Sequence, residues 1–219
     1  MVRMHQHSPN ISTPMNDIEE LYADDEIVVI NKPPKLLSVP GRYEPDSAVT
    51  RLQKIYGDIH VIHRLDNDTS GIIVYGRNKK ALTAIQQQFE KQNTHKIYEA
   101  LVIGSVSGSR GCINLPICVD WPNRPLQMIS HTQGRYALTR WKKLDDNGHE
   151  SRMELYPKTG RSHQLRLHMR ALGHAIVGDP FYAPESAAIT PRMMLHAREL
   201  SFCHPVSGKL MEMVCPTPF

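Results

Sequence analysis

An arginine and an aspartate two positions apart occupy a polar stretch early in the chain, within the segment His63-Arg64-Leu65-Asp66-Asn67-Asp68-Thr69-Ser70-Gly71. A carboxylate such as that of Asp66 can act as a nucleophile at a sugar carbon or as a base. The turn-forming residues after it bond readily to their own backbone and favour a rigid connection. The same spacing is also typical of a turn that Asp66 and Asp68 only cap, and the residues alone leave both interpretations open.

A second segment supplies the cation that such a carboxylate needs. Residues 162–172 have the periodicity of an amphipathic helix, with an apolar stripe of Leu165, Met169 and Leu172. Arg166 and Arg170 lie one turn apart on another face of this helix. Because a carboxylate in a dry pocket stays ionised only beside a fixed cation, Arg166 is the candidate partner of Asp66.

Two short strands are expected to hold the Asp66 loop at its ends. Residues 59–62 and 71–75 are rich in β-branched side chains, which favours buried strands. Further strands are predicted at 26–31, 96–106, 136–144 and 152–156, and a final pair at 194–203 and 209–214 is joined by a turn-rich link at 204–208. The turn-rich connections between these runs indicate antiparallel pairing. Together with the predicted helices they indicate an α+β fold.

Two more helices are predicted from apolar periodicity. The first spans residues 47–56, with Asp46 as its N-cap and Gly57 at its end. The second begins after an N-cap at Asn78. The apolar positions of the first are Val49, Leu52 and Ile55 or Tyr56, and those of the second are Leu82, Ile85 and Phe89. Both helices should pack on the sheet through these side chains.

Composition sets limits on the class of protein. The chain has 219 residues and a net charge of +4, which permits a polyanionic partner but is not the charge of a basic nucleic-acid tail. The 4 cysteines have no paired spacing, so we expect reduced thiols in the cytoplasm. Residues 1–16 lack the apolar core of a signal peptide and are predicted to form a flexible arm before a single domain at 17–219. The apolar runs are strand-sized, which indicates no membrane association.

Other reaction classes fit the residues less well. The chain has 12 histidines but no His-Glu-x-x-His or Cys/His pairing at ligand spacing, and His163 and His168 are five positions apart. We therefore expect no metal site. A methyltransferase would need a glycine-rich cofactor loop after its first strand, where Lys32-Pro33-Pro34 stands instead.

The segment around Asp66 resembles the signature of the RluA family of pseudouridine synthases, in which His-Arg-Leu-Asp is followed by Thr-Ser-Gly. Residues 159–168 and 178–182 are similar to two further blocks of the family, and the resemblance covers roughly residues 20 to 219. It implies a mixed, largely antiparallel sheet with flanking helices and a central RNA-binding cleft. It also implies an isomerase that needs no cofactor. Larger relatives have an S4-like RNA-binding domain, for which this chain has no room.

The resemblance also implies roles for individual residues. Asp66 is the catalytic carboxylate, Arg166 pairs with it, and Tyr98 stacks on the target base and helps proton transfer. Leu165 packs against the uracil, and Arg64 enters the space that the flipped nucleotide leaves. The residues by themselves favour core packing for Tyr98 and Leu165, and they are compatible with a surface salt bridge for Arg64.

The remaining predicted contacts to RNA are less specific. His63 is expected to be either an RNA contact or a buried hydrogen-bonding residue. The predicted contacts to phosphate are Lys79, Lys80, Arg124, Arg161 and Arg170.

The similarity extends to the branch of the family that modifies both a large-subunit ribosomal RNA hairpin and the anticodon stem-loop of transfer RNA. We therefore expect both RNAs as partners of a monomeric enzyme. The alternative is an RNA-binding or ribosome-assembly factor with a degenerate site. Such a factor would not need Asp66, so the presence of Asp66, Tyr98 and Arg166 together favours the enzyme.

Overall fold

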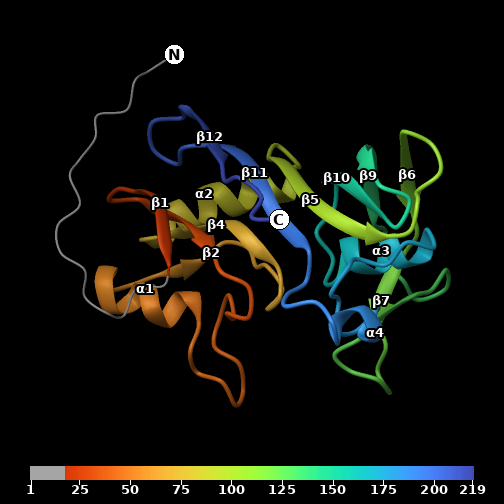
Figure 1. Ribbon diagram of the computed structural model, residues 1–219. Coiled ribbons are helices and arrows are strands. Elements are labelled where there is room, and N and C mark those ends of the chain that lie inside the picture. Colours follow the sequence, from red (N-terminus) through yellow and green to blue (C-terminus); the bar gives the residue numbers. More distant parts are fainter. Residues whose placement is uncertain (1–17) are drawn as a thin grey trace.

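The computed structural model describes residues 18–219, and the arm predicted at residues 1–16 lies outside them. Most of the strands form one sheet (Figure 1). Its order is β1 (Glu19–Ala23), β2 (Ile27–Lys32), β4 (Ser70–Gly76), β11 (Leu195–Cys203), β5 (His95–Ile103), β10 (Glu150–Pro157), β9 (Leu138–Asp146) and β6 (Arg110–Asn114). Two short additions are β3 (His60–Val61), which pairs with β4, and β12 (Leu210–Val214), which pairs with β11.

The sheet is mixed but largely antiparallel, because only β4 and β11 pair in parallel among the described strands. A separate small sheet joins β7 (Ile117–Val119) to β8 (Gln127–Ile129). The helices are α1 (Ala48–Tyr56), α2 (Lys79–Glu90), α3 (Gln164–Ala171) and α4 (Pro184–Ala187). Figure 1 shows α1 and α2 beside the β1–β4 half of the sheet and α3 and α4 beside the other half. The predicted α+β fold with flanking helices is confirmed.

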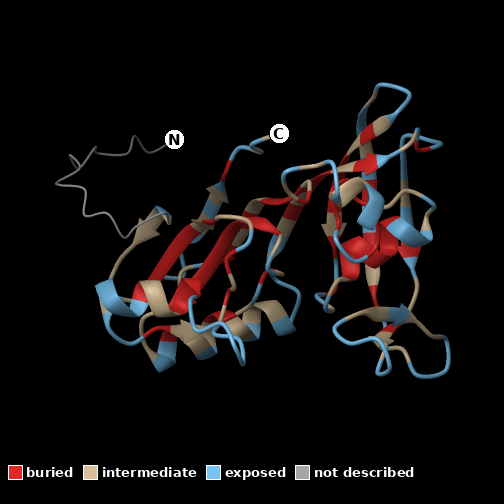
Figure 2. Cartoon of the chain, turned by 60° about the horizontal axis from the view of Figure 1, so that its bottom comes forward, coloured by how far each residue is buried: buried red, intermediate tan, exposed pale blue. Residues whose placement is uncertain are grey.

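Strand β2 is apolar at successive positions because helices cover both faces of this half of the sheet. Val28 and Ile30 pack with α1 on one face, whereas Ile27 and Val29 pack with α2 on the other. A strand buried on both sides loses the polar and apolar alternation of a half-exposed strand. Figure 2 shows this as a continuous band of buried residues through the inner strands.

The second half of the sheet has its own core. Met153 and Leu155 of β10 pack with Leu165 and Met169 of α3 in one buried cluster. Tyr98 of β5 lies against this cluster and also against the cluster under α1. Tyr98 therefore lies at the junction between the two halves of the sheet.

Several element boundaries differ from the prediction. The N-cap of α1 is Ser47, not Asp46, and its hydroxyl accepts a hydrogen bond from Thr50 N. Asp46 instead binds Arg51. The prediction at Asn78 is confirmed, since its side chain accepts from Ala81 N at 2.9 Å. Helix α3 begins two residues later than predicted because His163 has a left-handed backbone, with φ of 53°.

Candidate active site

The loop with Asp66 is held in place by the residues that follow β2. The buried ammonium of Lys32 donates to the carbonyl oxygen of Asn67 at 3.0 Å. The hydroxyl of Ser38 donates to Leu65 O at 2.7 Å and accepts from Leu65 N at 3.0 Å. Hydrogen bonds on both sides of Asp66 thus position its backbone.

The far end of this loop is fixed by the parallel pairing of β4 with β11. Gly71 lies opposite Ala197, and a β-carbon at Gly71 would be 2.4 Å from Ala197 O. The φ angle of Gly71 is +110°, which residues with a β-carbon rarely adopt. Glycine at this position lets the loop end directly against the centre of the sheet.

The Asp66 carboxylate does not cap the turn. Within residues 18–219 its recorded hydrogen bond is from Arg166 Nη1 to Oδ2, at 3.3 Å. The turn is closed by the backbone instead, from Thr69 N to Asp66 O at 3.2 Å. The side chain is 30% exposed, so a ligand can reach the carboxylate. The capping interpretation of Asp66 is therefore wrong.

Arg166 of α3 is 1% exposed and binds two carboxylates. Its Nε and Nη2 donate to Asp179, each at 2.7 Å, and its remaining terminal nitrogen faces Asp66. Burial alone would lower the pKa of Arg166, but the hydrogen bonds and charges of Asp179 and Asp66 raise it above its ordinary value. The guanidinium is thus a permanent cation beside Asp66.

The residues around Asp179 hold the guanidinium in one orientation. The fully buried Asp179 accepts from the backbone N–H groups of Phe181 at 2.9 Å and Tyr182 at 3.0 Å. The rings of these two residues lie 5.1 and 5.3 Å from the guanidinium carbon of Arg166. Two ion pairs and two aromatic faces therefore restrict Arg166 from several sides.

Tyr98 shares a pocket with Asp66 and Arg166. Burial, and secondly the charge of Asp66, raise the pKa of the phenol, which stays protonated at neutral pH. Its hydroxyl has no hydrogen-bond partner in the described part of the chain. A protonated and unengaged phenol beside a carboxylate can donate a hydrogen bond or a proton to a ligand.

The pocket brings together residues that are far apart in the chain. Its volume is about 100 Å³, and the predicted site residues that line it are Arg64, Asp66, Tyr98, Arg161, Leu165 and Arg166. Leu165 is both a core residue and an apolar wall of the pocket, so the two interpretations of it are compatible. An apolar wall beside a carboxylate, a cation and a phenol suits a flat ring with polar edges.

Other predicted contacts lie away from this pocket or have a different role. Four of the five predicted phosphate contacts do not line it, namely Lys79, Lys80, Arg124 and Arg170.

His63 does not line the pocket either. Its Nε2 accepts from Val74 N at 3.2 Å and its ring stacks on Phe89. Burial, together with the charge of Lys96, lowers the pKa of His63 to about 3, so the ring is neutral. The geometry favours the buried hydrogen-bonding alternative for His63.

Several supporting residues have no assigned role in the sequence analysis. Lys32 and Asp179 hold the Asp66 loop and Arg166, as described above. Gln164 accepts from Thr159 Oγ1 at 2.7 Å and from Arg161 N at 3.0 Å, and so fixes the turn at the rim of the pocket. Gln164 and Asp179 occur in the segments 159–168 and 178–182 that resemble the family, and Lys32 lies within the wider resemblance at residues 20 to 219. Their place in the family resemblance was the one signal that could have identified these residues, because their local spacing does not distinguish them from other polar residues.

A sequence profile of RNA pseudouridylate synthases matches residues 26–171, more than half of the chain. The chain belongs to the RNA pseudouridylate synthase family. This pseudouridylate synthase is 47% identical over 209 residues to the dual-specificity RNA pseudouridine synthase RluA of Vibrio vulnificus (strain CMCP6), covering 92% of this chain and 84% of the relative. For the protein of the same name in Escherichia coli (strain K12), the identity is 46% over 205 residues, covering 91% and 93%.

A solved structure has the same fold. Human RNA pseudouridylate synthase domain containing 1 matches this pseudouridylate synthase with a TM-score of 0.79 at 28% identity, over 96% of this chain and 87% of that one. The predicted family is confirmed, and the protein is an isomerase that forms pseudouridine in RNA.

Among residues 18–219, no helix is long and apolar enough to cross a membrane. The same residues contain no group of three or more His, Cys, Asp or Glu side chains arranged to hold a metal ion.

Proposed function

We propose that Asp66 is the catalytic carboxylate with which this enzyme isomerises uridine in RNA. The single observation that supports it best is the buried Arg166, which binds Asp179 and presents its remaining nitrogen to the accessible Asp66. In the reaction, the bond between N1 of uracil and C1′ of ribose breaks and the base turns. A bond from C5 to C1′ then forms, C5 loses its proton and N1 gains one. The atoms balance without a cofactor or an external reagent.

Asp66 acts either as a nucleophile at the sugar or as a base on it, and the geometry is compatible with both. Arg166 keeps the carboxylate ionised and oriented. Tyr98 stacks on the base and serves the proton transfer that accompanies the new bond. Leu165 packs against the other side of the uracil.

The target nucleotide must leave its stack to reach this pocket, which costs a few kcal/mol. Arg64 is exposed, lines the pocket and has no recorded ion pair in the described residues. We propose that the Arg64 side chain fills the space that the flipped nucleotide leaves in the stack. Of the five predicted phosphate contacts, Arg161 is the one that lines the pocket.

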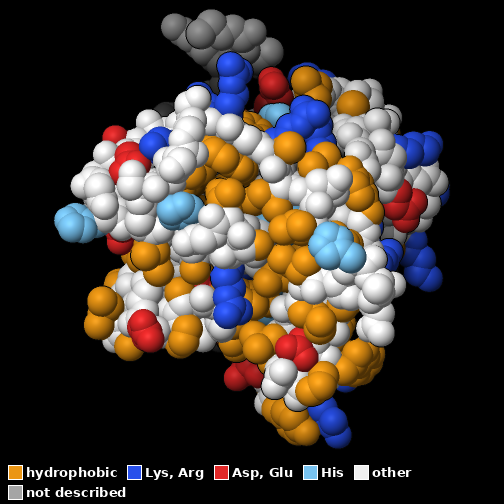
Figure 3. All heavy atoms as spheres, turned by 90° about the vertical axis from the view of Figure 1, so that its right-hand side faces the viewer, with side chains coloured by type: hydrophobic (Ala, Val, Ile, Leu, Met, Phe, Trp, Pro, Cys, Tyr) orange, Lys and Arg blue, Asp and Glu red, His pale blue; other side chains and the backbone are white. Residues whose placement is uncertain are grey.

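The proposed substrates are a hairpin of large-subunit ribosomal RNA and the anticodon stem-loop of transfer RNA. Support comes from the family resemblance and from relatives whose name specifies dual specificity. Lys and Arg side chains on the face in Figure 3 are spread among apolar and acidic ones. On this face the cations therefore form no single continuous basic stripe. We further propose that the enzyme works as a cytoplasmic monomer.

The experiment that tests the function is tritium release from C5-labelled uridine in unmodified transcripts of both RNAs. The wild type is compared with Asp66→Asn and with Asp68→Asn, a matched loss of charge in the same loop. We expect release by the wild type and Asp68→Asn but not by Asp66→Asn. Tight RNA binding by a wild type that releases no tritium would instead support the binding-factor alternative.

A further inference from the structure

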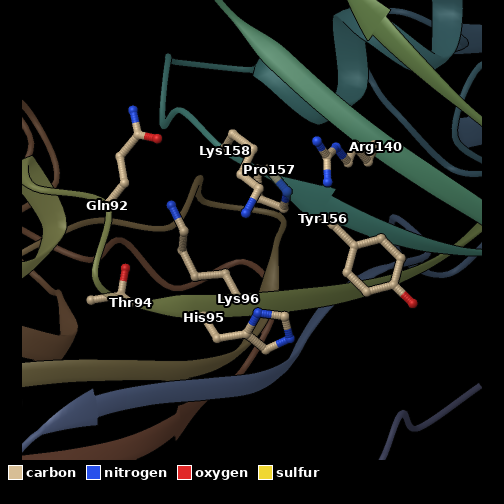
Figure 4. A pocket seen from close by; sticks show the side chains of 8 residues that line it. All are labelled: Gln92, Thr94, His95, Lys96, Arg140, Tyr156, Pro157 and Lys158. Atoms are coloured by element: carbon tan, nitrogen blue, oxygen red, sulfur yellow. The ribbon is translucent and has the colours of Figure 1, made fainter.

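A second hollow adjoins the pocket with Asp66, at the end of the sheet where β5 begins and β10 ends (Figure 4). Its volume is about 140 Å³, and its lining includes Gln92, Thr94, Lys96, Arg140, Pro157 and Lys158. We call it the basic hollow. Lys96 and Pro157 line both cavities, so the two cavities are neighbours.

Lys96 connects the basic hollow to the reacting centre. It precedes Tyr98 by two positions on β5, so both side chains project from the same face of the strand, roughly 7 Å apart along it. The side chain is only partly exposed. In the described part of the chain its ammonium has no ion pair and no hydrogen bond, and its recorded contact is with the Phe89 ring at 5.8 Å.

Two more cations gather at the same place without acidic partners. Arg140 of β9 lies opposite Tyr156 of β10, and Lys158 follows β10 directly. Neither side chain has an ion pair or a hydrogen bond among residues 18–219. Figure 4 shows Lys96 and Lys158 near one another, with Gln92 on one side and Arg140 on the other.

This lack of acidic partners contrasts with other parts of the protein. Arg198, for example, binds Glu99, Glu154 and Glu199. Burial, and secondly the charge of Lys158, lower the pKa of Lys96. An unpaired, partly buried ammonium beside a like charge is unfavourable, and an anion in the basic hollow would relieve both effects.

The uncharged lining residues also suit an anion. The Thr94 hydroxyl is buried and has no hydrogen-bond partner within the described residues. The Gln92 amide has no recorded side-chain hydrogen bond there either. Among the described residues, no Asp or Glu lines the basic hollow. Three cations with hydroxyl and amide donors are the groups that proteins present to phosphate.

We propose that the basic hollow binds a backbone phosphate of the RNA strand next to the target uridine, through Lys96, Lys158 and Arg140. The inference rests on the proposed function and adds a contact absent from the predicted phosphate residues. Because the two cavities share Lys96, holding this phosphate fixes the register of the strand when the base enters the Asp66 pocket. The basic hollow is thus a positioning site for the substrate, and its residues do not touch the reacting atoms.

The first test compares Lys96→Gln/Lys158→Gln with Lys54→Gln/Lys209→Gln, which removes the same charge from exposed positions elsewhere. For the anticodon stem-loop we expect KM to rise about tenfold in the first variant, with kcat within twofold of the wild type. The plot of log affinity against log salt should become shallower by about 0.7 for one lost single-strand phosphate contact. Equal KM values and salt slopes in the two double variants would overturn the proposal.

A second test locates the phosphate. Stem-loops are made with one neutral methylphosphonate linkage at each position around the target uridine, and binding is measured with Asp66→Asn as the background. A neutral linkage at one position should weaken binding in this background, but it should have no further effect once Lys158→Gln is added. Lys158 is exposed, so this substitution leaves the core intact. If the loss of affinity from Lys158→Gln instead added to the loss from the neutral linkage at every position, the basic hollow would not be a phosphate site. Because this readout is affinity, it is independent of turnover, whereas failure of the proposed function would appear as a wild type without tritium release.

Discussion

Arg166 and Asp179 form a two-point ion pair, with both hydrogen bonds at 2.7 Å and with both side chains almost fully buried. This pair leaves one guanidinium nitrogen for Asp66, at 3.3 Å. The orientation of the proposed catalytic carboxylate therefore depends on a second carboxylate that does not itself reach the pocket.

Replacing Asp179 with Asn should impair both folding and catalysis. A neutral amide leaves the buried Arg166 without its main counter-charge, and breaking a buried pair costs about 3–5 kcal/mol. We expect a corresponding loss in the free energy of unfolding by urea denaturation, with kcat lower by about 10²-fold at a temperature where the variant is folded. The exposed Asp145→Asn is the control. A folded Asp179→Asn enzyme with unchanged kcat would disprove the positioning role.

Replacing Tyr98 with Phe removes the hydroxyl and retains the ring. Because the phenol is protonated and has no recorded partner in residues 18–219, its hydroxyl is free to serve the reaction. We expect RNA affinity within about threefold of the wild type and turnover lower by about 10²–10⁴-fold, the range for a positioned acid or base. Tyr136→Phe, at an exposed position, is the control. Turnover like that of the wild type would contradict this role.

Replacing Arg64 with Ala should slow the step in which the base leaves the stack. Since unstacking costs a few kcal/mol, loss of the residue that fills the gap should lower kcat/KM by about 10- to 100-fold. Fluorescence of 2-aminopurine beside the target should report less unstacking in the variant. Arg110→Ala removes an exposed arginine from β6 as the control. An unchanged fluorescence signal would instead favour a surface role for Arg64.

The buried Lys32 should make stability depend on pH. Burial lowers its pKa from 10.5 to about 7, and the charges of Asp68 and Asp66 offset only part of this effect. Between pH 7 and 10.5 the unfolded chain then holds up to one proton more than the folded protein, so stability rises with pH in this window. In this window the free energy of unfolding of the wild type, measured relative to Lys32→Met, should increase by up to about 1.4 kcal/mol per pH unit.

Urea denaturation of both proteins from pH 6 to 9.5 measures this difference. Below the folded pKa both states bind the proton, so the difference should be constant there. A difference that stays constant up to pH 9.5 would show that the hydrogen bonds from the Lys32 ammonium to the carbonyl oxygens of Pro33, Leu36 and Asn67 keep it charged in the folded protein.

Elements that depend on local interactions were predicted well. β-branched runs correctly predicted β2 and β4, the turn-rich link at 204–208 correctly predicted the pair β11 and β12, and the Asn78 side chain caps α2 as expected. Less distinctive segments were missed, including β1 and the short pair β7 and β8. The N-cap of α1 was placed one residue early because Asp46 and Ser47 are both good caps, and the choice follows from the Arg51 partner of Asp46.

The sequence by itself determined the α+β class, most strands, and, through resemblance, the set of Asp66, Tyr98 and Arg166. Only the tertiary structure decided that Arg166 binds Asp179 more closely than Asp66, and that Lys32 holds the Asp66 loop. The basic hollow likewise exists only because β5, β10 and β9 are neighbours in the sheet. The spacing of apolar residues along the sequence indicates which face of a helix or strand is buried. The partner of a buried charge depends instead on residues that the order of strands in the sheet brings together.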